Sequence, residues 1–147
     1  MAPEEHSDHI VRTVNTPHQF SYENGILLTD VEPEYARGEL TVGPNSINPH
    51  GNVHGGALTT LADTVAGCCA CSEGGSCVTS SFSMEFLRPA TGSKIVCEAT
   101  PKKLGRNLSV IQVVLTNDQN KSVATGTFTF FMFSEESEEN SNEKEGV

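Results

Sequence analysis

Apolar and polar residues alternate in several stretches of the chain, and this period of two predicts β-strands. In the segment 78–87, for example, Phe82, Met84 and Phe86 share one face, while serine and glutamate side chains occupy the other. The segment 108–115 is apolar on both faces, which is typical of a central strand. The alternation and the turn residues between the segments predict strands at 25–31, 35–42, 78–87, 94–100, 108–115 and 122–133.

One stretch has the period of a helix instead. From residue 57 to residue 69 the apolar side chains recur at intervals of three and four residues. Glu73-Gly74-Gly75 then supplies the glycine that commonly follows a helix. One long helix is therefore predicted at 56–72, with two predicted strands before it in the sequence and four after it. This order predicts an α+β fold in which one antiparallel sheet wraps around a single helix.

The charge of the chain is concentrated at its ends. The 147 residues have a net charge of −10, and the segment 134–147 alone contains six Glu and one Lys. We expect a polar leader at 1–16, one folded domain at 17–133 and a disordered acidic tail at 134–147. A single sheet around one helix leaves an outer face and an edge uncovered. The domain is therefore expected to form homo-oligomers.

Several classes of protein are disfavoured by the sequence. The chain starts Met-Ala-Pro-Glu-Glu-His without a signal segment and has no apolar run long enough for a membrane helix. A cytoplasmic protein without a membrane partner is the default expectation. No basic face or motif indicates a nucleic-acid partner. No serine-hydrolase elbow, phosphate-binding loop or dinucleotide fingerprint is present.

The cysteines have one spacing that is also found in zinc sites. Cys68 and Cys71 are three residues apart, but both fall on the predicted helix, with Cys68 on the side away from its apolar face. We therefore interpret the cysteines as packing residues and predict no metal. Their odd number argues against a secreted disulfide framework. The five are Cys68, Cys69, Cys71, Cys77 and Cys97.

Candidate catalytic residues surround the start of the predicted helix. His54, Gly55 and Gly56 lead into it, and glycine lets a backbone approach a ligand closely. The first N–H groups of a helix lack partners within the helix, so they can polarise a carbonyl or hold an anion. Gly56 is the predicted donor. Asp63 follows two turns later on the flank of the apolar face, where partial burial would raise its basicity.

Basic residues gather in one short window between 88 and 106. Five of the nine Lys and Arg residues lie there against one acidic residue, Glu98. Such a local excess of positive charge predicts an anion site. The five are Arg88, Lys94, Lys102, Lys103 and Arg106.

These motifs together resemble the PaaI-like branch of the hotdog-fold 4-hydroxybenzoyl-CoA thioesterase superfamily. The resemblance covers residues 20–133. It implies hydrolysis of an acyl-CoA with an aromatic or medium-chain acyl group, without a cofactor. It also implies a dimer of dimers, hence a homotetramer, with active sites at the dimer interface. The motifs that carry it are Asn48-x5-His54-Gly55-Gly56, Asp63, Phe86-Leu87-Arg88-Pro89-Ala90 and Gly105-Arg106.

The resemblance also implies a role for each site residue. The Gly56 N–H would donate to the thioester carbonyl, Asn48 would help to hold the thioester or the water, and Asp63 would be nucleophile or general base. Thr79, from the facing subunit, would hold the water. His54 would either fix the loop or act as an acid–base group. The residues implied for CoA binding are Arg88, Lys103, Gly105 and Arg106.

Two other functions remain open at this point. A protein of the same fold could bind acyl-CoA without hydrolysing it, although a binder has no need of a carboxylate near the thioester. Hydratases or dehydratases of this fold also contain an Asn-Pro-His element, as in Asn48-Pro49-His50. Those enzymes usually have an aspartate shortly before that element, whereas Asn45-Ser46-Ile47 precedes it here.

Overall fold

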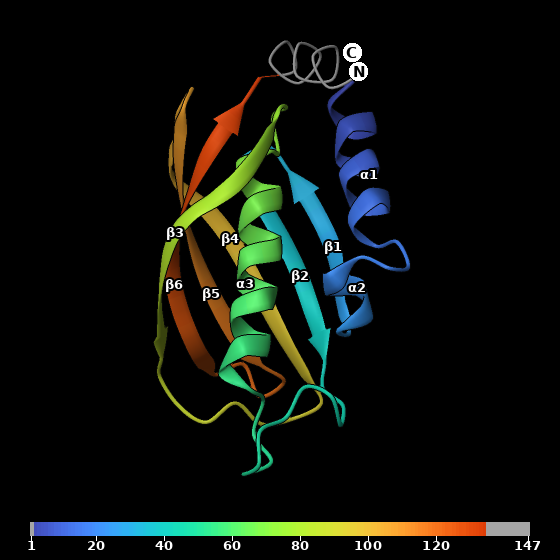
Figure 1. The fold of residues 1–147 in the computed structure, drawn as a ribbon, viewed down its shortest axis with the longest axis vertical. Coiled ribbons are helices and arrows are strands. Elements are labelled where there is room, and N and C mark those ends of the chain that lie inside the picture. Colours follow the sequence, from blue (N-terminus) through green and yellow to red (C-terminus); the bar gives the residue numbers. More distant parts are fainter. Residues whose placement is uncertain (1, 135–147) are drawn as a thin grey trace, which may run out of the picture.

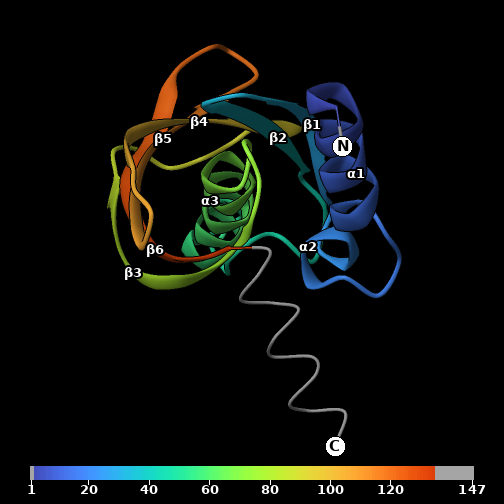
Figure 2. The same ribbon diagram turned by 90° about the horizontal axis from the view of Figure 1, so that it is seen from above.

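The protein folds as a six-stranded antiparallel sheet wrapped around one long helix, α3 (Gly55–Ala70) (Figures 1 and 2). The structure is a computed structural model and describes residues 2–134. The predicted α+β arrangement and the order of its elements are confirmed. In spatial order the strands are β1 (Ile26–Glu32), β2 (Tyr35–Thr41), β4 (Lys94–Leu104), β5 (Leu108–Asn117), β6 (Ser122–Phe133) and β3 (Ser76–Phe86).

The core lies between α3 and the concave face of the sheet. Leu61 and Val65 of the helix are fully buried, and alternate residues of β4 and β5 meet them from the sheet. Gly38 of β2 allows the helix to approach, since a Cβ atom there would lie 2.6 Å from a methyl carbon of Val65. Cys68, predicted to face away from the core, is only 7 % exposed because the sheet curves around more than one side of the helix.

Strand β3 occupies the far edge of the sheet. It follows α3 in sequence but pairs with β6 instead of with its sequence neighbour β4. Its apolar side chains Val78, Phe82 and Phe86 are each slightly more than half exposed. No other strand within residues 2–134 pairs with its second edge. β3 therefore leaves both backbone groups and apolar surface available for another chain.

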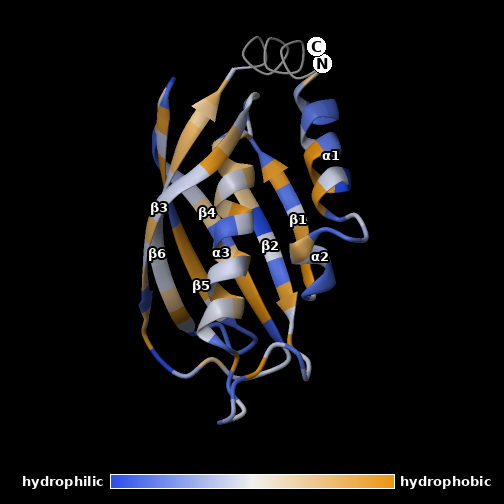
Figure 3. Cartoon of the chain, in the orientation of Figure 1, coloured by the Kyte–Doolittle hydropathy of each residue, from blue (hydrophilic) through white to orange (hydrophobic). Residues whose placement is uncertain are grey.

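The opposite edge, β1, is covered by α1 (Pro3–Val14) and the short helix α2 (Phe20–Glu23). Figure 3 shows the hydrophobic side of α1 turned toward β1, where Ile10, Val11 and Val14 pack against the core. Asn15 then binds the backbone N–H and carbonyl of Leu28, both at 2.8 Å. Residues 3–15, which lie in the predicted polar leader, are therefore docked on the sheet, while the predicted division of the chain into domains stays a prediction.

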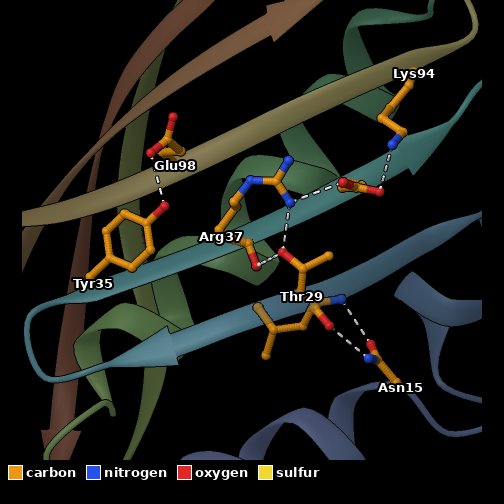
Figure 4. A network of polar contacts seen from close by, with 8 residues as sticks. Asn15, Thr29, Tyr35, Arg37, Lys94 and Glu98 are labelled. Carbon is orange, nitrogen blue, oxygen red and sulfur yellow. Dashed lines mark hydrogen bonds and ion pairs between the residues drawn. The ribbon is translucent and has the colours of Figure 1, made fainter.

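A polar network joins β1, β2 and β4 (Figure 4). Arg37 and Lys94 bind the two carboxylate oxygens of Glu39 at 2.9 and 3.2 Å. Burial alone would raise the pKa of Glu39, but these two cations lower it below its usual value. Tyr35 donates to Glu98 at 2.9 Å, and burial together with this carboxylate raises the pKa of Tyr35 to about 12.

Two of the sequence predictions concern the ends of the chain and membranes. The predicted acidic tail, 134–147, lies outside the described residues except for Ser134. Among the helices of residues 2–134, none has the length and apolar character needed to cross a bilayer.

Candidate active site

The first turn of α3 is capped by the residue that precedes it. His54 has the extended backbone of a helix N-cap, and its ring atom Nδ1 accepts the N–H of Gly56 at 2.8 Å. The N–H groups of Ala57 and Leu58 donate to the His54 carbonyl at 2.9 and 3.1 Å. Because Nδ1 is an acceptor, the ring carries its proton on Nε2. The Gly56 N–H, predicted to await a substrate carbonyl, already has a partner.

Gly55 has the one N–H of this first turn that finds no acceptor within residues 2–134. It lines a hollow of about 340 Å³ together with Asn48, Phe86 and Arg88. A Cβ atom on Gly55 would lie 3.5 Å from the ring of Phe86, so the end of β3 packs directly over the start of the helix. This hollow therefore presents an unpaired backbone donor beside an arginine.

Asn48 belongs to this hollow through its loop. Its side-chain oxygen accepts the backbone N–H groups of His50 and Asn52 at 3.0 and 3.1 Å. The oxygen of Asn48 thus stabilises the loop that leads into α3. Asn48, predicted for catalysis, and Arg88, predicted for CoA binding, are brought together here, and Asp63 is not among the residues that line this hollow.

Asp63 and Thr79 form a second constellation, two turns further along α3. The Thr79 hydroxyl donates to one carboxylate oxygen of Asp63 at 2.6 Å. The pair lines an open groove of about 440 Å³. A carboxylate has further lone pairs, so Asp63 can accept a proton from a water molecule while the Thr79 hydroxyl holds the carboxylate in place. The resemblance implied Thr79 of a facing subunit, whereas here Thr79 contacts Asp63 of its own chain.

The hollow at Gly55 and the Asp63–Thr79 pair lie far apart on both α3 and β3. Gly55 and Asp63 are eight residues apart on α3, which corresponds to about 12 Å along the helix axis. Their partners on β3, Phe86 and Thr79, are seven residues apart, or about 23 Å along the strand. A reacting carbon must lie about 3 Å from both its nucleophile and the donors to its oxygen. One chain by itself therefore does not place Gly55 and Asp63 around the same thioester.

The basic window is also divided by the fold. Arg88 lies just before β4, whereas Lys103 and Arg106 lie at the other end of that 11-residue strand. Gly105 sits in the turn between β4 and β5, where a Cβ atom would collide with the carbonyl oxygen of Leu108. Gly105 is thus required by the turn itself. Within one chain the strand β4 separates Arg88 from Lys103 and Arg106, so a single anion site formed by all of these residues stays a prediction.

Sequence reasoning missed the contribution of α2. Phe20 is 71 % exposed and lines the Asp63 groove on one side. On the other it lines a hollow of about 320 Å³ beside His54 and Gly56. Phe82 of β3 also lines this groove and stacks on Phe128 with ring centroids 5.1 Å apart. Two aromatic residues in a polar stretch, Phe20 and Tyr22, were the only signal for this segment.

Comparison with known proteins identifies the family. The model of the thioesterase superfamily matches residues 50–124. The chain belongs to the thioesterase superfamily. The acyl-coenzyme A thioesterase PaaI of Escherichia coli K12 is 32 % identical over 101 residues, covering 68 % of this chain and 72 % of that protein. The solved structure of E. coli PaaI superposes with a TM-score of 0.83 at 23 % identity, covering 90 % and 97 % of the two chains. The resemblance to PaaI-like hotdog thioesterases and the predicted enzyme class are confirmed.

A second relative bears on the Asp63–Thr79 pair. A hypothetical thioesterase from Streptococcus pneumoniae TIGR4, solved with coenzyme A, has a TM-score of 0.72 at 28 % identity, covering 78 % of this chain and 89 % of that one. Two variants of such a protein from the same organism, each 26 % identical, have TM-scores of 0.71 and 0.70 and cover 75 % of this chain and 92 % and 91 % of theirs. In one an aspartate, and in the other a threonine 16 residues later, is replaced by alanine. Asp63 and Thr79 have the same separation of 16 residues.

Proposed function

We propose that this thioesterase hydrolyses acyl-CoA to a carboxylic acid and CoA, with Asp63 as the reacting carboxylate. The hydrogen bond of Thr79 to Asp63 at 2.6 Å is the observation that carries the proposal. It holds a half-buried carboxylate in a groove open to substrate. The names of PaaI and of the CoA-bound pneumococcal protein support acyl-CoA as the substrate class.

Asp63 can act in either of two ways. As a general base it takes a proton from water, and the resulting hydroxide attacks the thioester carbon. As a nucleophile it attacks that carbon itself, and water then hydrolyses the mixed anhydride. In both cases the carbonyl oxygen gains negative charge and the CoA thiolate leaves. Thr79 restrains one oxygen of Asp63, so the other oxygen is the one directed to chemistry.

We propose Gly55, and not Gly56, as the backbone donor to the carbonyl oxygen. The Gly55 N–H is the donor of the first helical turn that remains without an acceptor in residues 2–134, whereas His54 holds the N–H of Gly56. The helix dipole adds partial positive charge at this end, which favours a developing oxyanion. Asn48 and His54 then act as positioning residues, since one holds the loop and the other caps the helix.

A second copy of the chain completes the site in this proposal. The exposed edge of β3 offers unpaired backbone groups and apolar side chains, and a two-fold dimer would pair it with the β3 of the second copy in the antiparallel sense. In antiparallel pairing the two β3 strands run in opposite directions, so a residue near the start of one strand lies opposite a residue near the end of the other. If the axis passes at the level of Phe82, Thr79 of one copy lies opposite Glu85 of the other, next to its Phe86. The Asp63 of one copy then approaches the Gly55 of its partner.

The same reversal reunites the divided basic residues. Lys103 is level with Ser81 through the ladder of β4, β5, β6 and β3, and Arg106 lies beyond Leu108, which is level with Val78. With the axis at Phe82, the level of Leu108 meets Phe86 of the second copy, two residues before its Arg88. Lys103 and Arg106 of one copy and Arg88 of the other would then contact the phosphates of one CoA.

We propose an aromatic or medium-chain acyl group as the substrate. Phe20 and Phe82 are exposed apolar residues that line the groove together with Asp63, and an acyl chain would cover both. Aromatic rings stack favourably on such side chains, and Phe82 already stacks on Phe128.

The test is Asp63→Asn, which keeps the shape of the side chain and removes its charge. Release of CoA thiol from a panel of aromatic and medium-chain acyl-CoAs should fall by about 10²–10⁴ in kcat, with CoA affinity and melting temperature preserved. Asp30→Asn, at an exposed aspartate of β1, is the matched control and should retain full activity. A destabilised but active Asp63→Asn variant would show a structural carboxylate. Tight acyl-CoA binding without thiol release by the wild type would show a non-catalytic binder.

A further inference from the structure

Two thiols face each other where α3 ends and β3 begins. Sγ of Cys71 and Sγ of Cys77 are 3.2 Å apart, and the Cys77 thiol also lies 3.6 Å from the carbonyl oxygen of Gly67. Both residues are partly exposed, whereas the other three cysteines are 7 % exposed or less. Cys71 and Cys77 are thus the thiols that a reagent in solution can reach. The proposed reaction does not use them.

We propose that Cys71 and Cys77 are a modification site that forms a reversible disulfide with a low-molecular-weight disulfide as oxidant, and that closing it lowers turnover. The effect on turnover rests on the proposed function of Asp63 and Thr79. The formation of the disulfide does not, because it follows from the placement of the two sulfur atoms alone.

The chemistry is two thiol–disulfide exchanges. The thiolate of one cysteine attacks a sulfur of the reagent, for example oxidised glutathione, and releases one molecule of glutathione thiol. The thiolate of the second cysteine attacks the mixed disulfide at the protein sulfur and releases the other. Two protein S–H groups become one S–S bond, and the reagent accepts two electrons and two protons as it becomes two thiols.

The geometry favours closure within the chain. The S–S bond of a disulfide is about 2.05 Å long, so the sulfur atoms must approach by roughly 1 Å. The connecting segment contains Gly74 and Gly75, both with positive φ, and is a tight turn that already brings the two cysteines together. The hydrogen bond with Cys71 and burial raise the pKa of the Cys77 thiol, so exchange is expected to be slow at neutral pH.

The dithiol is coupled to the Asp63–Thr79 pair through both elements. Asp63 and Gly67 lie four residues apart on one side of α3, and Cys71, which caps the end of the helix, follows four residues later. Thr79 comes two residues after Cys77, hence on the same face of β3. Drawing the sulfur atoms together moves the start of β3 along the end of the helix and shifts Thr79 against Asp63. A displacement of about 1 Å near reacting groups can reduce a rate by as much as 10²-fold.

The experiment oxidises the full-length protein with oxidised glutathione and reverses the reaction with dithiothreitol. The thiol count after denaturation should fall from the five cysteines of the chain to three, with a loss of two hydrogen masses and no bound glutathione. The melting temperature should rise by about 5 °C, because a short loop is closed in the unfolded chain. The kcat should fall at least threefold, about the effect of 0.7 kcal/mol, and recover on reduction.

Variants locate the effect. Cys71→Ser and Cys77→Ser should each abolish both the disulfide and the fall in kcat on oxidation. Cys97→Ala, which changes a buried cysteine of the core, should keep both. Five thiols after oxidation, or a response that survives in either serine variant, would overturn the site. A disulfide that leaves kcat unchanged would overturn the coupling. A protein inactive toward every acyl-CoA would refute the proposed function and the effect on turnover, while the thiol count still decides the disulfide.

Discussion

Gly55→Pro removes one hydrogen-bond donor and tests which glycine polarises the thioester. The position tolerates proline, since Gly55 is the first residue of α3 and its N–H is not used within the helix. The residue before it, His54, has φ −62° and ψ 136°, which are the angles that a following proline requires. The N–H of Gly56 remains on His54. The helix should therefore form as before.

The expected loss follows from the single missing donor. Removing one donor to an oxyanion typically costs about 10²–10³ in kcat, or about 2.7–4 kcal/mol, because the charge it stabilises exists only in the transition state. The KM for acyl-CoA should change little for the same reason. Initial rates of CoA thiol release at several substrate concentrations give both constants, and a thermal melt reports folding.

Gly55→Ala is the matched control. It keeps the N–H, and its Cβ would lie at ordinary contact distance, 3.5 Å, from the Phe86 ring. It should retain kcat within about threefold. A folded Gly55→Pro enzyme with nearly normal kcat would refute Gly55 as the donor and return attention to Gly56 with a displaced His54. An equal loss of kcat in both variants would indicate that the loss comes from disturbed packing against Phe86 and not from the missing N–H.

The inactive Asp63→Asn and Gly55→Pro chains can be unfolded, mixed in equal amounts and refolded together. Half of the dimers would then contain one chain of each kind and have one of their two sites intact, so about a quarter of the wild-type activity should return. A site built within one chain would give no recovery. Arg106→Ala should raise the KM for acyl-CoA, because the loss of one charge-assisted contact costs about 1–2 kcal/mol of binding free energy. The KM for an acyl thioester that lacks the nucleotide should change much less. Lys121→Ala, in the β5–β6 turn, is its control, and equal effects on both substrates would exclude nucleotide contact. Glu39→Gln should lower stability at pH 7 by less than about 1 kcal/mol, because the ion pairs are partly exposed. The pKa of Glu39 is lowered in the fold, so this stabilisation is present above its ordinary value of 4.5 and is lost as the pH falls through the lowered one; the melts of both proteins should converge as the pH falls further below 4.5, and a constant difference would argue against the ion pairs.

The local elements could be predicted from the sequence because they depend on the period of side chains along the chain. The helix predicted at 56–72 begins at Gly55 and ends at Ala70, and the strand predicted at 122–133 has those bounds in the structure. The strand predicted at 94–100 continues to Leu104, since the irregular pairing at Pro101 lets it pass a residue that interrupts the pattern. The docked helix α1 was only hinted at by three apolar residues in a polar stretch.

The candidate site was predicted in part. The position of Asp63, two turns after His54-Gly55-Gly56 and beside the apolar face, is a property of one helix and was readable from the spacing. The contact of Thr79 with Asp63 depends on how β3 lies along α3. The hydrogen bond from Gly56 to His54 depends on the rotamer of one side chain. Neither leaves a periodic signal, and the roles of all these residues remain predictions.

The sequence by itself determined the central helix, the six strands and the carboxylate near the helix start. Tertiary structure alone decided that β3 lies at an edge, that Gly55 and Asp63 lie in different hollows, and that a strand divides the basic residues. The physical reason is that periodicity reports only whether a residue faces the core. Which strand pairs with β3 is decided by packing among segments more than 35 residues apart, because β3 pairs with β6. That pairing leaves the other edge of β3 open for a second chain.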